Sequence, residues 1–472
     1  MTEENKPLLN ESIHFDKQSD SDTTCTPIIT QKKTFYSYYD SLPFTYKHAM
    51  ILIASVMIYF SQSCQFISYN ILIPVLRTEF SSSNKNLITS ISSIIFIGFL
   101  VGTLFVGKCT EKLSRRKGIL IALSSITFFG ITITIFESLI TIFICRMIIG
   151  FFLGMMIPQV LSNLFETLPN NDYKELLMFS VFIFGRLGYV YFLSVYPLFE
   201  GNWRVSFVLA VSPMIITLFI SVLFFTDSLK LLYNKQQIDS LINEINIYND
   251  IRKLPPISNE EAENLKVESE LFLSLSKDKN DFSYMMLFKP IYLKSTILFI
   301  IMTTFSAMVS LTNIYTLPLI FSSNNAEYNI SNMIITQCVT IPAVVFAAIS
   351  SKFLGRKSTI IIGFSMCFFF SLLPFFYSKS FIIASSIINF FVMFIICTVR
   401  LFVMEIYPTK LRDISLAVVY AIAMIGEAIT PFLSDFSMGI SLIRGTYVQI
   451  NLLSFIGLVA SIIISSEKKK NE

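Results

Sequence analysis

The sequence has few charged residues. Asp, Glu, Lys and Arg together make up 14% of its 472 residues, whereas hydrophobic residues make up 53%. Soluble domains carry about 25% charged residues. A soluble chain of this length could not cover its surface with so few charges, so the composition excludes that class and predicts an integral membrane protein.

Several other features are scarce. The chain has two histidines, of which His48 lies at the edge of an apolar run, so we expect neither a histidine proton relay nor a metal site. The seven cysteines fall mostly inside apolar runs, and none pair up in a candidate external loop, so we expect no structural disulfide. We find no catalytic constellation and no phosphate-binding loop, and we therefore expect neither an enzyme nor a cofactor. The basic residues cluster in loops next to apolar runs, which indicates topology and not nucleic-acid binding.

Residues 1–46 are polar and predict a disordered cytoplasmic tail. They contain no apolar segment typical of a cleavable signal peptide, so the first membrane helix is expected to direct insertion. Glu4, Leu8 and Leu9 have the spacing of the acidic dileucine signal Glu-x-x-x-Leu-Leu, which sorting adaptors of endosomes and lysosomes read. The alternative is an inert tail, because this short pattern often arises by chance.

Apolar runs of about 20 residues, each long enough to cross a hydrocarbon core of about 30 Å, recur along the rest of the chain. Six precede a polar segment at 227–291, which has a candidate amphipathic helix at 236–247, and six follow it. The sequence thus predicts an all-α membrane protein with twelve transmembrane helices in two six-helix bundles, at 47–226 and 292–465, and a short cytoplasmic tail at 466–472. The runs lie near 49–73, 87–107, 118–136, 139–161, 176–198 and 205–226, and then near 294–321, 331–351, 358–377, 380–402, 414–434 and 446–465.

The orientation follows from residues 107–117, GKCTEKLSRRK, where five basic residues lie between two apolar runs. The positive-inside rule places this loop in the cytoplasm, and an even number of spans then places both termini there. Asn329 begins a glycosylation sequon on the outer side, but it directly precedes an apolar run, so we do not expect it to be used.

The two halves resemble each other in sequence. Arg115 and Arg356 are 241 residues apart in matching short motifs, and the Glu-x-x-Pro motifs at Glu166 and Glu405 are 239 residues apart. Two independent motifs with nearly equal offsets indicate a duplicated bundle. Such duplication is typical of transporters, whose solute site lies near the membrane midplane between the two repeats.

The loop at 107–117 resembles the loop between helices two and three of the major facilitator superfamily, Gly-x-x-x-Asp-Arg/Lys-x-Gly-Arg-Arg/Lys. The resemblance implies that Glu111, Arg115 and Arg116 latch the first bundle to the start of helix eleven when the cytoplasmic gate is shut. Lys352 occupies the acidic position in the second copy, so one ionic lock is expected and not two. The alternative is that the basic residues only fix topology.

Other motifs support the same resemblance. Arg146, Gly150 and Gly154 share one helical face and match the family's Arg-x-x-x-Gly-x-x-x-Gly element in helix four. An arginine in the apolar region is costly unless it faces protein or water, so Arg146 is a further solute or coupling candidate, with helix packing as the alternative. Residues 405–412 resemble the Glu-x-Tyr-Pro-Thr-x-x-Arg signature of the sugar, organic-ion and synaptic-vesicle-protein-like branch, and Glu405 and Arg412 are therefore expected to belong to the cytoplasmic gate. Residues 226–230 resemble a degraded form of that branch's Pro-Glu-Ser-Pro-Arg signature, with both prolines missing.

Two ionisable residues at membrane depth are the strongest solute or coupling candidates. Arg186 lies in the fifth run and Glu427 in the eleventh, again 241 residues apart. An ionisable group inside the membrane predicts a functional site by default. Arg186 suits a carboxylate or phosphate, and Glu427 suits a cation or the coupled proton. The alternative is a structural bond for each residue. Their symmetry does not make them a pair, because equivalent helices lie on opposite sides of the pseudo-twofold axis.

Weaker candidates are uncharged polar residues on helices that line the cavity in this family. They are Gln65 and Tyr69 in the first run, Ser310 and Asn313 in the seventh, Gln337 in the eighth and Tyr420 in the eleventh. The alternative for each is a hydrogen bond between helices.

These observations predict a monomeric secondary active transporter of a small polar or charged organic solute, with the proton as a candidate coupling ion. Its partners are the solute, the lipid bilayer and, through the tail, sorting adaptors. The expected location is an endosomal, lysosomal or other vesicle membrane, with the plasma membrane as the alternative. The alternative function is a transport-inactive relative that acts as a nutrient sensor or vesicle membrane protein.

Overall fold

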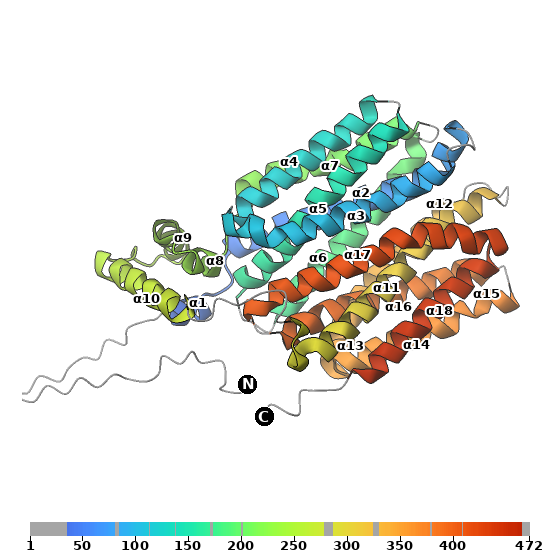
Figure 1. Cartoon of the computed structure of the whole chain (residues 1–472). Coiled ribbons are helices and arrows are strands. Elements are labelled where there is room, and N and C mark those ends of the chain that lie inside the picture. The colour runs from blue at the N-terminus through green and yellow to red at the C-terminus, as the bar shows by residue number, and fades with distance from the viewer. Residues whose placement is uncertain are drawn as a thin grey trace, which may run out of the picture.

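The computed structural model describes residues 35–80, 85–112, 114–136, 138–169, 173–199, 202–277, 287–323, 330–377, 380–407 and 409–464. Within these ranges it describes helices and no strands. Twelve of these helical segments are long and apolar enough to cross a membrane, as the sequence predicts. They form two bundles that lie side by side, one drawn blue to green and the other yellow to red in Figure 1.

The first bundle contains α2 (Tyr46–Glu79), α3 (Lys85–Lys112), α4 (Arg115–Ile135), α5 (Leu139–Thr167), α6 (Lys174–Val195) and α7 (Trp203–Phe224). Three short helices follow: α8 (Leu229–Asn234), α9 (Ile238–Ile251) and α10 (Asn259–Lys277). The second bundle contains α11 (Pro290–Ser323), α12 (Ile330–Cys338), α13 (Thr340–Phe353), α14 (Arg356–Ser371), α15 (Leu373–Phe376), α16 (Phe381–Ile406), α17 (Thr409–Ile440) and α18 (Arg444–Ile463).

The bundles meet along two seams. One seam joins α3 to α17, and the other joins α6 to α12 and α13, while α2 also contacts α11. This arrangement leaves α2, α6, α11, α16 and α17 around the centre of the molecule. The helices α8–α10 and α1 (Phe35–Asp40) lie together beyond one end of the first bundle (Figure 1). We call this end of the molecule the capped end and the opposite end the far end.

Several helices extend beyond the apolar runs that predict them. The run near 49–73 becomes α2, which continues to Glu79, and the run near 414–434 becomes α17, which ends at Ile440. Polar side chains lie in these last turns, so hydropathy alone places the helix ends too early. Backbone hydrogen bonding continues a helix past the apolar segment.

Glycines bring α3 and α5 unusually close. A Cβ atom added at Gly98 would lie 2.1 Å from the backbone oxygen of Met147, and one at Gly154 would lie 2.1 Å from the oxygen of Phe99. Real Cβ atoms essentially never approach that closely, so only glycine fits at these positions. Close contact of small residues is how membrane helices gain packing contacts in the absence of a hydrophobic driving force.

The capped end has its own small apolar core, and this corrects the prediction of a disordered tail through residue 46. Phe35 in α1 stacks on Tyr233 in α8 with ring centroids 4.2 Å apart, and Leu241 and Ile245 of α9 are buried in the same cluster. The backbone N–H of Phe35 donates to both carboxylate oxygens of Glu268 at 3.3 Å, and burial raises the pKa of that carboxyl group. Phe35 and Tyr39 of α1 are buried in this cluster, which explains why α1 is folded. The polar composition of residues 1–46 as a whole concealed these two aromatic residues.

Candidate functional site

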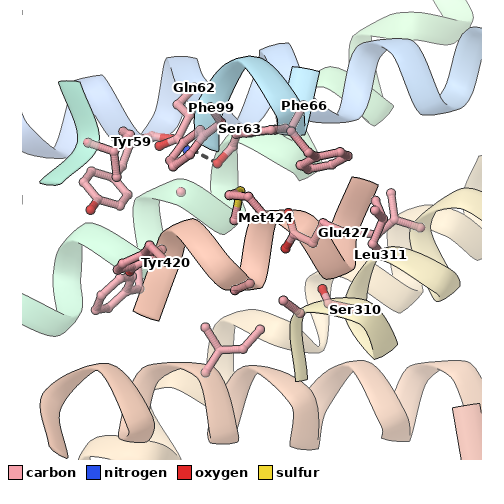
Figure 2. Close-up of a pocket in the computed structure, with 18 of the residues that line it drawn as sticks. Tyr59, Gln62, Ser63, Phe66, Phe99, Ser310, Leu311, Tyr420, Met424 and Glu427 are labelled. Atoms are coloured by element: carbon pink, nitrogen blue, oxygen red, sulfur yellow. Dashed lines mark hydrogen bonds between the residues drawn. The ribbon is translucent and has the colours of Figure 1, made fainter. Parts of the chain in front are cut away.

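A cavity of about 150 Å³ lies between the two bundles. Its walls come from five central helices, with smaller contributions from α3 and α5. Figure 2 shows Tyr420, Met424 and Glu427 on α17 between α2, which carries Gln62 and Ser63, and α11, which carries Ser310 and Leu311. Their spacing of three or four residues turns one face of α17 to the cavity. The other polar or charged lining residues are Tyr59, Asn70, Arg186, Tyr189, Thr303 and Arg400.

Arg186 and Glu427 both line this cavity, one from each bundle. Equivalent positions in the two repeats thus face the same cavity from opposite bundles. Arg186 lies about 18 Å along α6 from Lys174, at 1.5 Å per residue. Glu427 interacts electrostatically with both Arg186 and Arg400, yet among the described residues it forms no direct ion pair. All three side chains are partly exposed, as expected for groups that line a cavity.

Arg400 is a cavity residue that the sequence reasoning missed. It lies on α16, six residues before the end of that helix, and its guanidinium carbon is 5.2 Å from the centroid of Phe182 and 4.9 Å from that of Tyr420. Phe182 belongs to the first bundle, so Arg400 crosses between the bundles. An arginine inside an apolar run was the signal that could have identified it, as it identified Arg186.

Three predicted site residues have structural partners inside the first bundle. The Arg146 guanidinium donates to the backbone oxygen of Gln65 at 3.0 Å and lies 5.0 Å from the ring centroid of Tyr69. The amide of Gln65 donates to the backbone oxygen of Ala210, and the hydroxyl of Tyr69 donates to that of Ile88. Arg146, Gln65 and Tyr69 are buried, and none lines the cavity. Their geometry agrees with the alternative of helix packing.

The uncharged candidates of the second bundle fall into two groups, one at the cavity and one away from it. Tyr420 and Ser310 line the cavity, whereas Asn313 and Gln337 are buried elsewhere. Asn313 Nδ2, Gln337 Oε1 and the Tyr420 hydroxyl find no hydrogen-bond partner within the described part of the chain.

At the far end, one polar network joins the bundles. Arg77 of α2 donates to both carboxylate oxygens of Asp435 on α17, at 3.1 and 3.0 Å. Thr89 of α3 donates to the same carboxylate at 2.7 Å, and Tyr315 of α11 donates to it at 3.1 Å. We call these four residues the far-end latch. Arg77 and Asp435 lie just beyond the apolar runs near 49–73 and 414–434, so hydropathy does not reveal them.

At the capped end, each bundle has an internal ion pair. Arg115 pairs with Glu166 at 2.5 Å, and Arg356 pairs with Glu405 at 2.7 Å. These four residues are the ones whose offsets revealed the repeat. The Arg115–Glu166 pair and the equivalent Arg356–Glu405 pair each lie within one bundle. The latch to helix eleven stays a prediction, since the side chain of Glu111 lies outside the described part of the structure.

Arg116, the second arginine assigned to the latch, also has partners in and next to the first bundle. The backbone N–H of Arg116 donates to Asp227 at 2.9 Å, and its guanidinium donates to the backbone oxygen of Val222. Ser228 donates to Glu166 at 2.5 Å. The degraded signature at 226–230 therefore binds the start of α4 through Asp227 and the end of α5 through Ser228. The side chains of Glu111 and Arg412 lie outside the described part of the structure, as do residues Glu4, Leu8, Leu9 and Asn329.

Comparison with known proteins identifies the family. The model of the Major Facilitator Superfamily matches residues 51–431. The chain belongs to this superfamily. It is therefore a member of a family of membrane transporters and is not an enzyme.

Individual relatives match more weakly. Synaptic vesicle glycoprotein 2C of Mus musculus is 30% identical over 101 residues, which cover 21% of this chain and 14% of that protein. The gentisate transporter of Corynebacterium glutamicum is 25% identical over 156 residues, or 32% of this chain and 35% of that protein. The chain thus matches well under half the length of either relative.

The proton:xylose symporter XylE, solved with 6-bromo-6-deoxy-D-glucose, has the same fold. It superposes with a TM-score of 0.70 at 16% identity, over 88% of this chain and 95% of that chain. XylE from E. coli in a partially occluded inward-open conformation gives a TM-score of 0.66 at 15% identity, over 88% of this chain and 98% of that chain.

Proposed function

We propose that this protein is a secondary active transporter that moves a small organic solute by alternating access of its two bundles. The main support for this proposal is the cavity between the bundles, which is lined by Arg186, Arg400 and Glu427. Ionisable side chains at membrane depth are costly and are retained where a solute or ion needs them. The far-end latch supports a cycle in which the two bundles separate at one end at a time.

Glu427 is the proposed proton carrier. A carboxylate in a cavity near two arginines changes the charge of the site by one unit when it binds a proton. A single acidic group that faces each side of the membrane in turn is sufficient to couple a proton to the movement of a solute.

The test uses the purified protein in proteoliposomes. A panel of labelled organic acids, sugars and amines is offered with and without an inward proton gradient. We expect Glu427→Gln to abolish accumulation driven by the gradient while exchange of solute across the membrane continues. Glu263→Gln, on the exposed face of α10, is the matched control. Unchanged accumulation in Glu427→Gln would remove this residue as the coupling group.

The proposed location is a vesicle, endosomal or lysosomal membrane, with the capped end and both termini in the cytoplasm. The basic loop at 107–117 supports this orientation through the positive-inside rule, and Glu4, Leu8 and Leu9 supply an adaptor-binding signal. One relative is named as a synaptic vesicle protein. Leu8→Ala with Leu9→Ala should then move the protein to the cell surface, and an unchanged distribution would reject the signal.

A further inference from the structure

The guanidinium of Arg400 is the second cationic group of the cavity. Its Nε atom is buried and finds no hydrogen-bond partner among the described residues. The rings of Phe182 and Tyr420 contact the group and supply attraction between cation and π-face. They satisfy none of its five N–H donors. The guanidinium therefore has donors available for an acceptor that comes from outside the chain.

The charge of the cavity has a definite sign. Two arginines and one glutamate line it, so the site carries one net positive charge with Glu427 ionised and two with Glu427 protonated. An anion therefore gains from either state, and it gains more from the protonated one. A neutral solute would leave at least one of the two guanidinium groups without a counter-charge, which is unfavourable at this depth.

The size and lining of the cavity restrict which anions fit it. A volume of about 150 Å³ is the size of a cavity that holds one benzene ring. Most of the remaining wall is aromatic or aliphatic, and a few hydroxyl and amide groups are interspersed. The aromatic members are Tyr59, Phe66, Phe96, Phe99, Phe182, Tyr189 and Tyr420.

We propose that this cavity binds a small carboxylate anion of about one-ring size, with the carboxylate on Arg186 and Arg400 and the apolar body against the aromatic wall. This proposal rests on the proposed transport function and names its substrate class. Two guanidinium groups match the geometry of a carboxylate, because each offers paired donors to its oxygens. Protonation of Glu427 strengthens carboxylate binding, so proton and anion load the same state together.

The experiment measures binding to the full-length protein in detergent, by displacement of labelled benzoate. The competitors have one ring and differ in charge: benzoate, benzyl alcohol, benzylamine and phenylglycine. A fifth compound, 1-naphthoate, keeps the carboxylate and adds a ring. We expect benzoate to compete best, the alcohol and the amine to compete at least about tenfold more weakly, and naphthoate to be excluded by size.

Two variants locate the carboxylate. Arg400→Gln and Arg186→Gln should each weaken benzoate binding about ten- to hundredfold, as expected when a charge-assisted hydrogen bond is lost. Arg400→Lys keeps the charge without the paired donors and should lie between Arg400→Gln and the wild type. Arg444→Gln is the control, because Arg444 is exposed at the start of α18 and does not line the cavity. The melting temperature of each variant, with and without benzoate, separates lost binding from lost folding.

The outcomes separate the two proposals. If benzyl alcohol or phenylglycine matches benzoate, or if benzylamine exceeds it, the substrate class is wrong and the transport function stands. If the two Gln variants fold and bind benzoate as well as Arg444→Gln, the arginines do not hold the carboxylate and the inference fails. If no acid, sugar or amine of the transport panel binds or moves, the proposed function itself fails.

Discussion

The far-end latch makes a quantitative prediction for Asp435→Asn. The carboxylate of Asp435 accepts hydrogen bonds from Arg77 and Thr89, both on the first bundle. Hydrogen bonds to a charged group contribute about 1.5–3 kcal/mol each, and partial exposure lowers that figure. The Arg77 and Asp435 side chains are 21% and 19% exposed, and asparagine keeps one acceptor oxygen, so we expect a net loss of about 2 kcal/mol. That loss shifts the ratio of open to closed far ends about 30-fold toward open.

Spin labels measure this shift directly. One label at Ser90 of α3 and one at Phe436 of α17, both near the far end, report the separation of the bundles. Asp435→Asn should add a population at longer distance, whereas Asp239→Asn, an exposed residue of α9, should not. The charge swap Arg77→Asp with Asp435→Arg should restore the short distance. A distance distribution that is the same in Asp435→Asn and wild type would refute the reasoning.

The remaining predictions concern packing. Gly98→Ala places a methyl group 2.1 Å from the backbone oxygen of Met147, so it should lower stability by about 1–3 kcal/mol or more and lower the melting temperature. Gly439→Ala is the control, because nothing lies within 4 Å of the added atom, and an equal effect of both would contradict the close-contact argument. Phe35→Ala removes a ring stacked on Tyr233 and should release α1, which faster amide exchange of residues 35–40 would report while benzoate binding is unchanged. Protection of α1 equal to wild type would show that the stack does not hold it.

The fold was predictable from twelve apolar runs, which indicate the spanning helices, and from two motif offsets, which indicate the repeat. The membrane environment requires every spanning segment to satisfy its own backbone, so hydropathy predicts helices reliably. The offset between Arg115 and Arg356, and that between Glu166 and Glu405, anticipated two copies. The structure adds that each arginine of this set pairs with the glutamate of its own copy. Sequence spacing alone does not show pairing.

The site was predictable in part. Four predicted candidates do line the cavity: Arg186, Glu427, Ser310 and Tyr420. They could be predicted because an ionisable or polar residue inside an apolar helix is rare enough to stand out. Arg146, Gln65 and Tyr69 met the same criterion, yet they bond to one another and to neighbouring helices. Which face of a helix points to the centre depends on how the helices pack, and no local pattern contains that information. The far-end latch joins residues 358 positions apart in the chain, so only the three-dimensional fold brings them together.

The glycine contact between α3 and α5 has a mechanical consequence. Backbone atoms touch along this pair, so the two helices have no room to slide or rotate against each other. The seam between α3 and α17 includes the far-end latch, whose Thr89–Asp435 hydrogen bond can break and re-form. A covalent cross-link across α3 and α5 should therefore leave turnover intact, whereas one across α3 and α17 should arrest it. We therefore expect α3 and α5 to move together as one rigid unit, and the movement between the bundles to take place where α3 meets α17.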